Sequence, residues 1–256
     1  MLMALARSVL LEAVRRKDIY VIILLCCTLI GVAMAMDFFG LTGLVKFYRE
    51  IALRLMGTAT AIAVILLATR QLPREFEQRT IYPLLARPIG RALFLLGKGL
   101  GIQAAAVFCF GLFMLLYVAG LLYLGGPVGW SLFAQHLLLQ FLQMMLLTAA
   151  CFLLSLAFSK DAALTLGLLL YFAADLISHV SLNLYEMTNA FGRAILHLLL
   201  YILPQLSLFD LSRKTLHEEI WEPLGLGVIF ALAAYALVYT LVYGAGAYLL
   251  FRRRPL

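Results

Sequence analysis

Long stretches of the chain carry no charged side chain, and they are the most regular feature of the sequence. Residues 19–36 contain no Asp, Glu, Lys or Arg, and neither do residues 99–159. A helix needs about 20 apolar residues to cross the hydrocarbon core of a bilayer. The run at 99–159 is too long for one crossing, and only the segment Gly125-Gly126-Pro127-Val128-Gly129 interrupts it. This pattern predicts two helices joined by a tight hairpin.

The same criterion predicts six membrane-spanning helices within a single domain that covers residues 1–256. The six predicted spans are residues 19–36, 51–72, 99–124, 130–158, 161–181 and 224–251. The span at 51–72 reaches full length if Arg54 extends its guanidinium toward the membrane surface. An apolar patch at 194–209 is short for a span and contains Pro204. We therefore expect residues 182–223 to form an external re-entrant or interfacial segment.

The composition agrees with an all-α membrane protein and excludes a soluble globular domain. The chain is 64% hydrophobic and 13% charged, with a mean hydropathy of +1.01. Globular domains usually carry about 25% charged residues, which solvate their surface. The four cysteines all fall in predicted spans and lack the spacing of a metal or redox site, so no metal is expected.

The basic residues predict the orientation of the chain, because cytoplasmic segments carry an excess of Lys and Arg. If the amino terminus is inside, fourteen of the twenty basic residues are cytoplasmic. These are Arg7, Arg15, Arg16, Lys17, Arg70, Arg74, Arg79, Arg87, Arg91, Lys98, Lys160, Arg252, Arg253 and Arg254. Both termini are then cytoplasmic. Membrane lipid explains the net charge of +7 without a nucleic-acid partner, and we expect a multi-pass protein of the cell membrane, in bacteria the inner membrane.

The amino-terminal arm, residues 1–18, combines an apolar and a charged face. Its apolar residues recur at helical spacing: Leu2, Leu5, Ala6, Val9, Leu10 and Ala13. This periodicity predicts an amphipathic helix that lies in the inner headgroup plane. An ordinary cytoplasmic leader is the alternative.

Residues 70–98 join the second and third predicted spans and mix charges of both signs. Pro73 can open a helix at its first turn, where no amide donor is needed. Glu75 and Glu77 would lie near the positive end of that helix, and Glu75 could pair with Arg79 four residues on. Apolar side chains on a short cytoplasmic helix predict a partner surface. The segment carries three of them, Ile81, Leu84 and Leu85.

These residues resemble the signature of type-2 ABC exporter permeases. The signature reads Glu75-x-Glu77-x-Arg79-Thr80-Ile81-x-x-Leu84-Leu85-Ala86-Arg87-Pro88-Ile89-Gly90-Arg91 and is followed by Gly97-Lys98. The resemblance implies a coupling helix in the region 73–91, an elbow helix at 1–18 and an external re-entrant region. A merely basic cytoplasmic loop would explain the arginines, but not the paired glutamates or the Leu84-Leu85 pair.

The resemblance also implies that the membrane-spanning permease and the ATP-binding subunit are separate chains. This chain would be the permease of an ATP-driven exporter, paired with a second copy or a homologous permease. Two copies of a separate ATP-binding subunit would hold ATP and Mg and dock on the coupling helix. The docking residues implied are Glu75, Glu77, Arg79, Thr80, Ile81, Leu84, Leu85 and Arg87. The alternative is a mechanotransmitting or signalling subunit of the same type, which acts on periplasmic or accessory proteins without transport.

Polar residues inside predicted spans are candidates for a translocation path. Tyr171, Asp175 and His179 share one face of the fifth span. The fourth span has its own polar line, which includes His136, Gln140 and Gln143. These side chains could border a path between two copies of the protein. Hydrogen bonding between helices that merely holds the bundle together is the alternative.

The chain lacks the motifs of an enzyme. Gly97-Lys98 is not part of a phosphate-binding loop, because Gly99 occupies the position of the required Ser or Thr. His217-Glu218 does not begin an HExxH motif, since Trp221 stands where the second histidine belongs. No catalytic residue is expected, and no cofactor bound by this chain.

Overall fold

A computed structural model describes most of the chain, and the account below concerns only the described residues. These are residues 2–15, 24, 27–28, 31, 44–77, 90–126, 129–187, 189, 192–193, 201, 203–212, 214 and 223–253. Within these ranges the chain forms six α-helices and a short 3-10 helix, η2 at Leu206–Phe209, and no β-strand. The predicted all-α class is confirmed.

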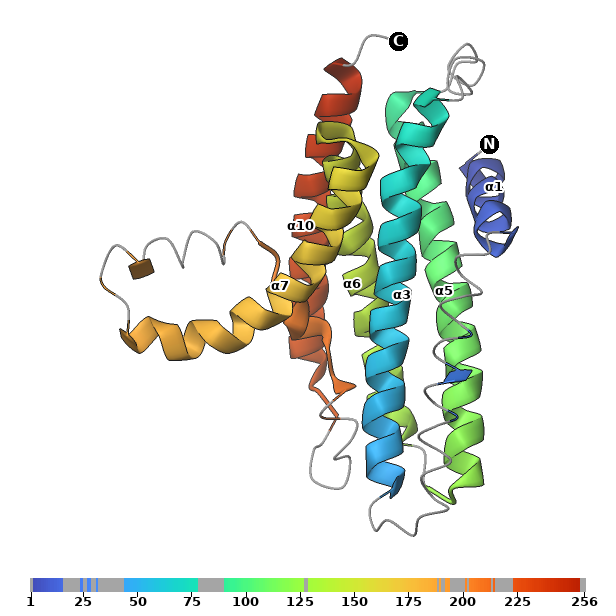
Figure 1. The fold of residues 1–256 in the computed structure, drawn as a ribbon, viewed down its shortest axis with the longest axis vertical. Coiled ribbons are helices and arrows are strands. Elements are labelled where there is room, and N and C mark those ends of the chain that lie inside the picture. The colour runs from blue at the N-terminus through green and yellow to red at the C-terminus, as the bar shows by residue number, and fades with distance from the viewer. Residues whose placement is uncertain are drawn as a thin grey trace.

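Four long helices run side by side along the length of the molecule (Figure 1). They are α3 (Leu44–Glu77), α5 (Arg91–Tyr123), α6 (Trp130–Ala157) and α10 (Leu226–Arg253). Each is long and apolar enough to cross a membrane. They overlap the predicted spans at 51–72, 99–124, 130–158 and 224–251.

The predicted hairpin in the long uncharged run is confirmed by the turn that follows α5. The helix ends at Tyr123, and the amide of Gly126 donates to the carbonyl of Leu121 at 3.0 Å. Gly125 has a φ of 68°, a conformation that costs glycine little. The chain then re-enters the bundle as α6, which begins at Trp130.

The two remaining predicted spans are not among these four helices. Residues 19–36 lie almost entirely outside the described part of the chain. Residues 161–181 fall in α7 (Lys160–Met187), a continuous helix whose second half swings away from the bundle (Figure 1). A count of six spans therefore stays a prediction.

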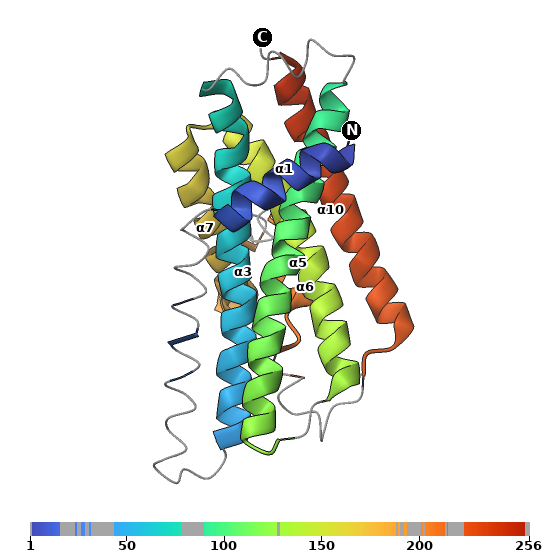
Figure 2. The ribbon, with the colours of Figure 1, turned by 90° about the vertical axis from the view of Figure 1, so that its right-hand side faces the viewer.

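Several helix ends gather at one end of the bundle, which we call the upper end because it is uppermost in Figure 1. It is defined by the last residues of α3 and α10 and the first residues of α5 and α7: Glu77, Arg253, Arg91 and Lys160. Helix α1 (Leu2–Arg15) also begins toward this end (Figures 1 and 2). The shared end agrees with the predicted topology, although cytoplasmic sidedness itself stays a prediction.

At the lower end, α3 and α5 approach each other closely around Tyr48. The Tyr48 hydroxyl donates to the carbonyl of Leu116 at 2.9 Å, so the buried phenol has a hydrogen-bond acceptor. A Cβ atom at Gly120 would lie 2.0 Å from the Tyr48 hydroxyl oxygen. Glycine is therefore required there. The ring of Tyr117 stacks between Tyr48 and Phe133 of α6, with centroids 6.4 and 4.8 Å apart.

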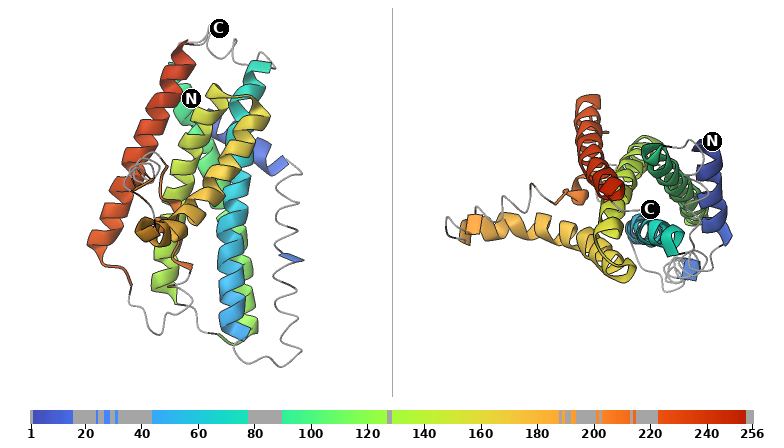
Figure 3. Two further views of the ribbon diagram at one scale, coloured as in Figure 1. Left: turned by 60° about the vertical axis from the view of Figure 1, so that its left-hand side comes forward. Right: turned by 90° about the horizontal axis from the view of Figure 1, so that it is seen from above.

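The helices differ strongly in how much of their surface is covered. In the most apolar window of α3, 67% of the residues are buried, whereas in the most apolar window of α10 only 6% are buried. Figure 3 shows α10 at the side of the bundle, next to α6. Before its last two arginines, the large side chains that it exposes are apolar, including Leu226, Phe230 and Leu241. Such a surface suits lipid tails, which solvate apolar side chains as well as a protein interior does.

Candidate functional site

The upper end of α3 differs from the expected local structure. We expected Pro73 to open a separate short helix, but α3 runs through Pro73 and ends at Glu77. Proline in a helix interior removes one backbone hydrogen bond, a loss that packed membrane helices tolerate. Because the helix is continuous, Glu75 and Glu77 are rigidly joined to the long α3 segment.

A buried ion pair links this end of α3 to α5. The ammonium of Lys98 donates to Oε1 of Glu75 at 2.6 Å. The Lys98 side chain is 4% exposed and that of Glu75 is 15% exposed. The ammonium also lies over the ring of Phe94, 5.8 Å from its centroid, in the range of a cation–π contact. The partner that the sequence predicts for Glu75, Arg79, lies outside the described residues, so that pairing stays a prediction; Lys98, 23 positions along the chain, is a partner that the sequence did not indicate.

Arg91, the first residue of α5, binds the end of α10. Its Nη1 donates to the carbonyl of Phe251 at 3.2 Å and to that of Arg252 at 2.6 Å. The last carbonyls of a helix have no partners within the helix and carry partial negative charge. The guanidinium therefore caps α10 and fixes its end beside α5.

Aromatic rings fill the space between these polar links. Phe251 of α10 is fully buried. Its ring lies 5.9 Å from the ring of Phe76 on α3 and 5.9 Å from that of Phe94 on α5. Ring pairs at this spacing add to the stability gained by burial alone. The polar and aromatic contacts together form what we call the upper-end cluster: Glu75, Phe76, Arg91, Phe94, Lys98 and Phe251.

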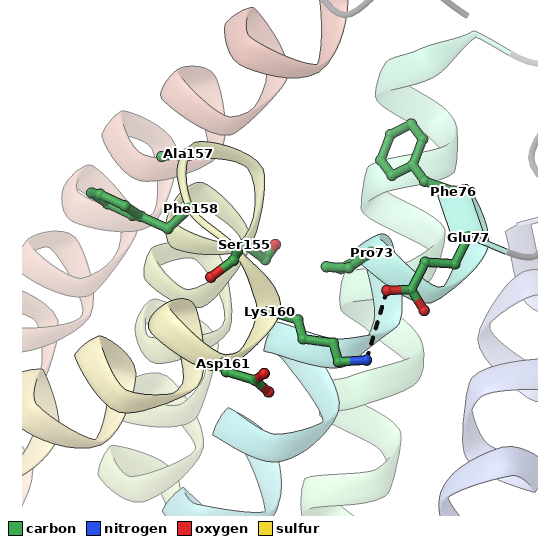
Figure 4. A pocket seen from close by; sticks show the side chains of 9 residues that line it. Pro73, Phe76, Glu77, Ser155, Ala157, Phe158, Lys160 and Asp161 are labelled. Atoms are coloured by element: carbon green, nitrogen blue, oxygen red, sulfur yellow. Dashed lines mark ion pairs between the residues drawn. The ribbon is translucent and has the colours of Figure 1, made fainter.

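A pocket of about 580 Å³ lies beside this cluster, between the end of α3 and the turn from α6 to α7. Figure 4 shows Glu77 reaching across it toward Lys160, at a distance of 3.7 Å. Both side chains are about half exposed, so this pair contributes little to stability. Ser155, Ser159 and Asp161 complete its polar lining. The pocket thus presents both signs of charge to the upper end.

Helix α1 (Leu2–Arg15) crosses the outside of α5 and α3 obliquely near the upper end (Figure 2). Glu12 accepts from Arg74 and, at 3.3 Å, from Gln71, both on α3. Val9 is fully buried against α5, where a Cβ atom at Gly101 would lie only 2.6 Å from the Cβ of Val9. The helix expected in the amino-terminal arm is present. Its position in the headgroup plane stays a prediction.

The remaining docking residues that the sequence predicts lie outside the described part of the chain: Arg79, Thr80, Ile81, Leu84, Leu85 and Arg87. Of the predicted set, Glu75 turns inward to Lys98 and Glu77 stays exposed. The missed residues are Arg91 and Lys98. The sequence placed Arg91 at the end of the coupling region and Lys98 directly before the third span, but it held no signal for their partners.

The predicted translocation residues separate into two groups. His136, Gln140 and Gln143 are buried inside the bundle, with exposed fractions of 0%, 3% and 4%. Tyr171 on α7 is half-buried. The backbone of α7 includes Asp175 and His179, but their side chains lie outside the description.

A ladder of tyrosines on α10 holds part of the segment 182–223, which the sequence predicts to be external. The hydroxyl of Tyr239 donates to the carbonyl of Tyr201 at 2.8 Å. The hydroxyl of Tyr235 accepts from the amide of Gln205 at 3.0 Å. Tyr239 stands 13 residues into α10, about 20 Å from its lower end. The chain therefore reaches the middle of α10, although re-entry into a membrane stays a prediction for residues 182–223.

These features define a multi-pass α-helical membrane protein. The chain belongs to the ABC-2 family transporter proteins, because the model of that family matches residues 3–256. Members are permeases, the membrane-spanning subunits of ABC transporters that work with an ATP-binding subunit, and are not themselves catalytic. None of the curated proteins compared with the chain matches it.

Proposed function

We propose that this chain is the permease of an ATP-driven exporter and that the ATP-binding subunit docks at the upper end of the bundle. The docking element is the coupling region at 73–91, whose first residues continue α3. The ATP-binding subunit holds ATP and Mg, and two copies of it serve two permeases, either identical or homologous. The complex lies in the cell membrane, in bacteria the inner membrane, with both termini cytoplasmic.

The observation that carries this proposal is the upper-end cluster. It connects the end of α3, where the coupling region begins, to α5 through Lys98 and to α10 through Arg91 and Phe251. Helix α1 is tied to the same turn of α3 by Glu12. A force applied next to Glu77 would therefore act on four helices together.

This arrangement favours movement of the bundle as a body. Packed interfaces switch between discrete arrangements rather than deform smoothly. Closure of the ATP-binding subunits would displace the coupling region, and the cluster would make α5 and α10 follow α3. Such a displacement could change access to a translocation path along the interface between two permeases.

Charge reversal at the coupling region tests the docking surface. Glu77→Lys combined with Arg79→Glu should release the ATP-binding subunit during purification from membranes. Glu50→Lys is the matched control, because Glu50 is an exposed residue of α3 at the lower end. Retention of the subunit by the double variant, with ATP hydrolysis still coupled, would overturn the assignment.

A mechanotransmitting role without transport is the second candidate, and the tyrosine ladder favours it. Tyr235 and Tyr239 join the external segment to α10, and Arg91 joins the other end of α10 to α5. Movement at the upper end could thus reach partners outside the membrane. Transport measured in liposomes that contain the complete complex separates the two candidates. Movement of a substrate driven by ATP favours the exporter, and ATP hydrolysis without any transported substrate favours mechanotransmission.

A further inference from the structure

A row of polar side chains runs along the buried face of α6. His136 is fully buried, and Gln140 and Gln143 follow it at one-turn intervals with exposed fractions of 3% and 4%. Thr148, further along α6, is 4% exposed and faces α5, where its hydroxyl accepts from Gln103. All four are enclosed within one copy of the chain, so they do not line an open surface between two copies.

The acceptors in this row lack partners. Both ring nitrogens of His136 and the Oε1 atoms of Gln140 and Gln143 have no hydrogen bond to any residue that the structure describes. Gln103 of α5 also has an amide oxygen that is unpaired in the described part of the chain. Its amide nitrogen donates to the hydroxyl of Thr148 at 3.4 Å, while its own Oε1 finds no donor within the same described ranges.

Unpaired polar groups are rare in protein interiors, and several of them in one row are more unusual still. In the orientation that the structure shows, the amides do not satisfy one another, because the Oε1 atoms of all three glutamines have no donor among the described residues. The facing surface of α3 does not satisfy them either. The Gln140 amide lies against Gly57, where a Cβ atom would be 3.4 Å from its Oε1, and glycine has no side chain to donate.

We propose that this row is a water-binding site inside each protomer, between α3, α5 and α6. Water is the ligand whose chemistry fits: it is small, it donates two hydrogen bonds, and it can accept the N–H of His136. The site begins six residues into α6 at His136, and its last member on this face is Gln143, a length of about 10 Å. It differs from a translocation path between two copies.

Water in this position has a mechanical consequence. Direct side-chain contacts between α3 and α6 would lock one register, whereas bridging waters exchange partners at little cost. The hydrated row would let α3, which leads to the upper-end cluster, shift against α6.

Thiol chemistry tests the hydration directly, since a cysteine reacts as the solvated thiolate. The native cysteines are first replaced by alanine in the full-length chain. Single cysteines are then placed by Gln140→Cys and Gln143→Cys. Leu139→Cys and Leu146→Cys are matched controls, because both leucines lie on α6 and are fully buried among apolar residues. Membranes are treated with Ag⁺, and the thiols that remain are counted with a maleimide after denaturation.

The cysteines at 140 and 143 should react with Ag⁺ at least about tenfold faster than those at 139 and 146. Equal rates at all four positions would overturn the proposal, because the row would then be as dry as its surroundings. A bulky trimethylammonium thiosulfonate should fail at every position. Its rapid reaction at 140 and 143 would also overturn the proposal, since it requires an open passage and not an enclosed site.

Thermal unfolding of a second variant keeps the proposal testable if the cysteine variants fold poorly. Gln143→Met retains the volume of the side chain but removes its acceptor. In a hydrated row the bridging waters lose a partner, and the melting temperature should fall by about 2–4 °C. In a dry row the substitution removes an unpaired polar group, so an unchanged or higher melting temperature would overturn the proposal.

Discussion

Removal of Lys98 should destabilise the protein through the partner that it leaves behind. In Lys98→Met the carboxylate of Glu75 keeps its position, 15% exposed, but loses its ammonium. Breaking a buried ion pair on one side costs about 3–5 kcal/mol, because the remaining carboxylate loses its ammonium partner in a poorly solvated place. The partial exposure of Glu75 favours the lower end of that range, about 3 kcal/mol.

The double variant separates the ion pair from simple packing. Replacement of both partners by apolar residues, Lys98→Met with Glu75→Leu, leaves no buried charge and should recover most of the loss. The exposed pair between Arg74 and Glu12 is the internal control, since their side chains are 44% and 29% exposed. Arg74→Ala should therefore cost less than about 1 kcal/mol.

Thermal unfolding in detergent micelles, followed by circular dichroism, measures all four proteins. A loss of about 3 kcal/mol lowers the melting temperature of a chain this size by roughly 6–12 °C. The reasoning fails if Lys98→Met shifts the melting temperature no more than Arg74→Ala does. It also fails if the double variant is less stable than the single one.

Three further substitutions test other contacts. Gly101→Ala places a Cβ atom 2.6 Å from that of a buried valine in α1, and it should cost about 1–3 kcal/mol and expose α1 to limited proteolysis. Unaltered cleavage would contradict the packing. Tyr48→Phe loses the hydrogen bond to α5 and should cost about 1 kcal/mol in thermal unfolding, where an unchanged midpoint counts against the contact. Arg91→Ala leaves the last carbonyls of α10 without their donor, so hydrogen exchange should quicken in its final turn; equal exchange rates would refute the capping role.

The long apolar helices could be predicted because their signal is local. Absence of charge over a spanning length marked α5, α6 and α10, a shorter uncharged run extended past Arg54 marked α3, and five consecutive residues at 125–129 marked the hairpin between α5 and α6. Such features depend on the solvent that a segment meets rather than on the neighbour it packs against. The helices therefore followed from composition and order alone.

The contacts of the upper end could not be predicted in the same way. The sequence favoured Arg79 for Glu75 because residues four apart are neighbours on a helix. Arg79 lies outside the described residues, and the partner that the structure does show, Lys98, lies on another helix and comes into reach only when α3 and α5 pack together. Likewise, the spacing of His136 and Gln140 showed that they share a face, but only the packed bundle shows that this face is internal.

Helix α10 is placed to transmit a displacement from the upper end of the molecule toward the lower end. Its upper end is held by Arg91 and Phe251, and its middle is bonded to the external segment through Tyr239. Its outer face is exposed, since only 6% of its apolar window is buried, while its inner face packs along α6. A helix transmits an axial displacement along its length because every turn is hydrogen-bonded to the next. If the ATP-binding subunit acts through α10, Tyr239→Phe should preserve ATP hydrolysis but uncouple it from the segment that Tyr239 bonds. Loss of ATP hydrolysis itself would show that the displacement is not transmitted through this contact.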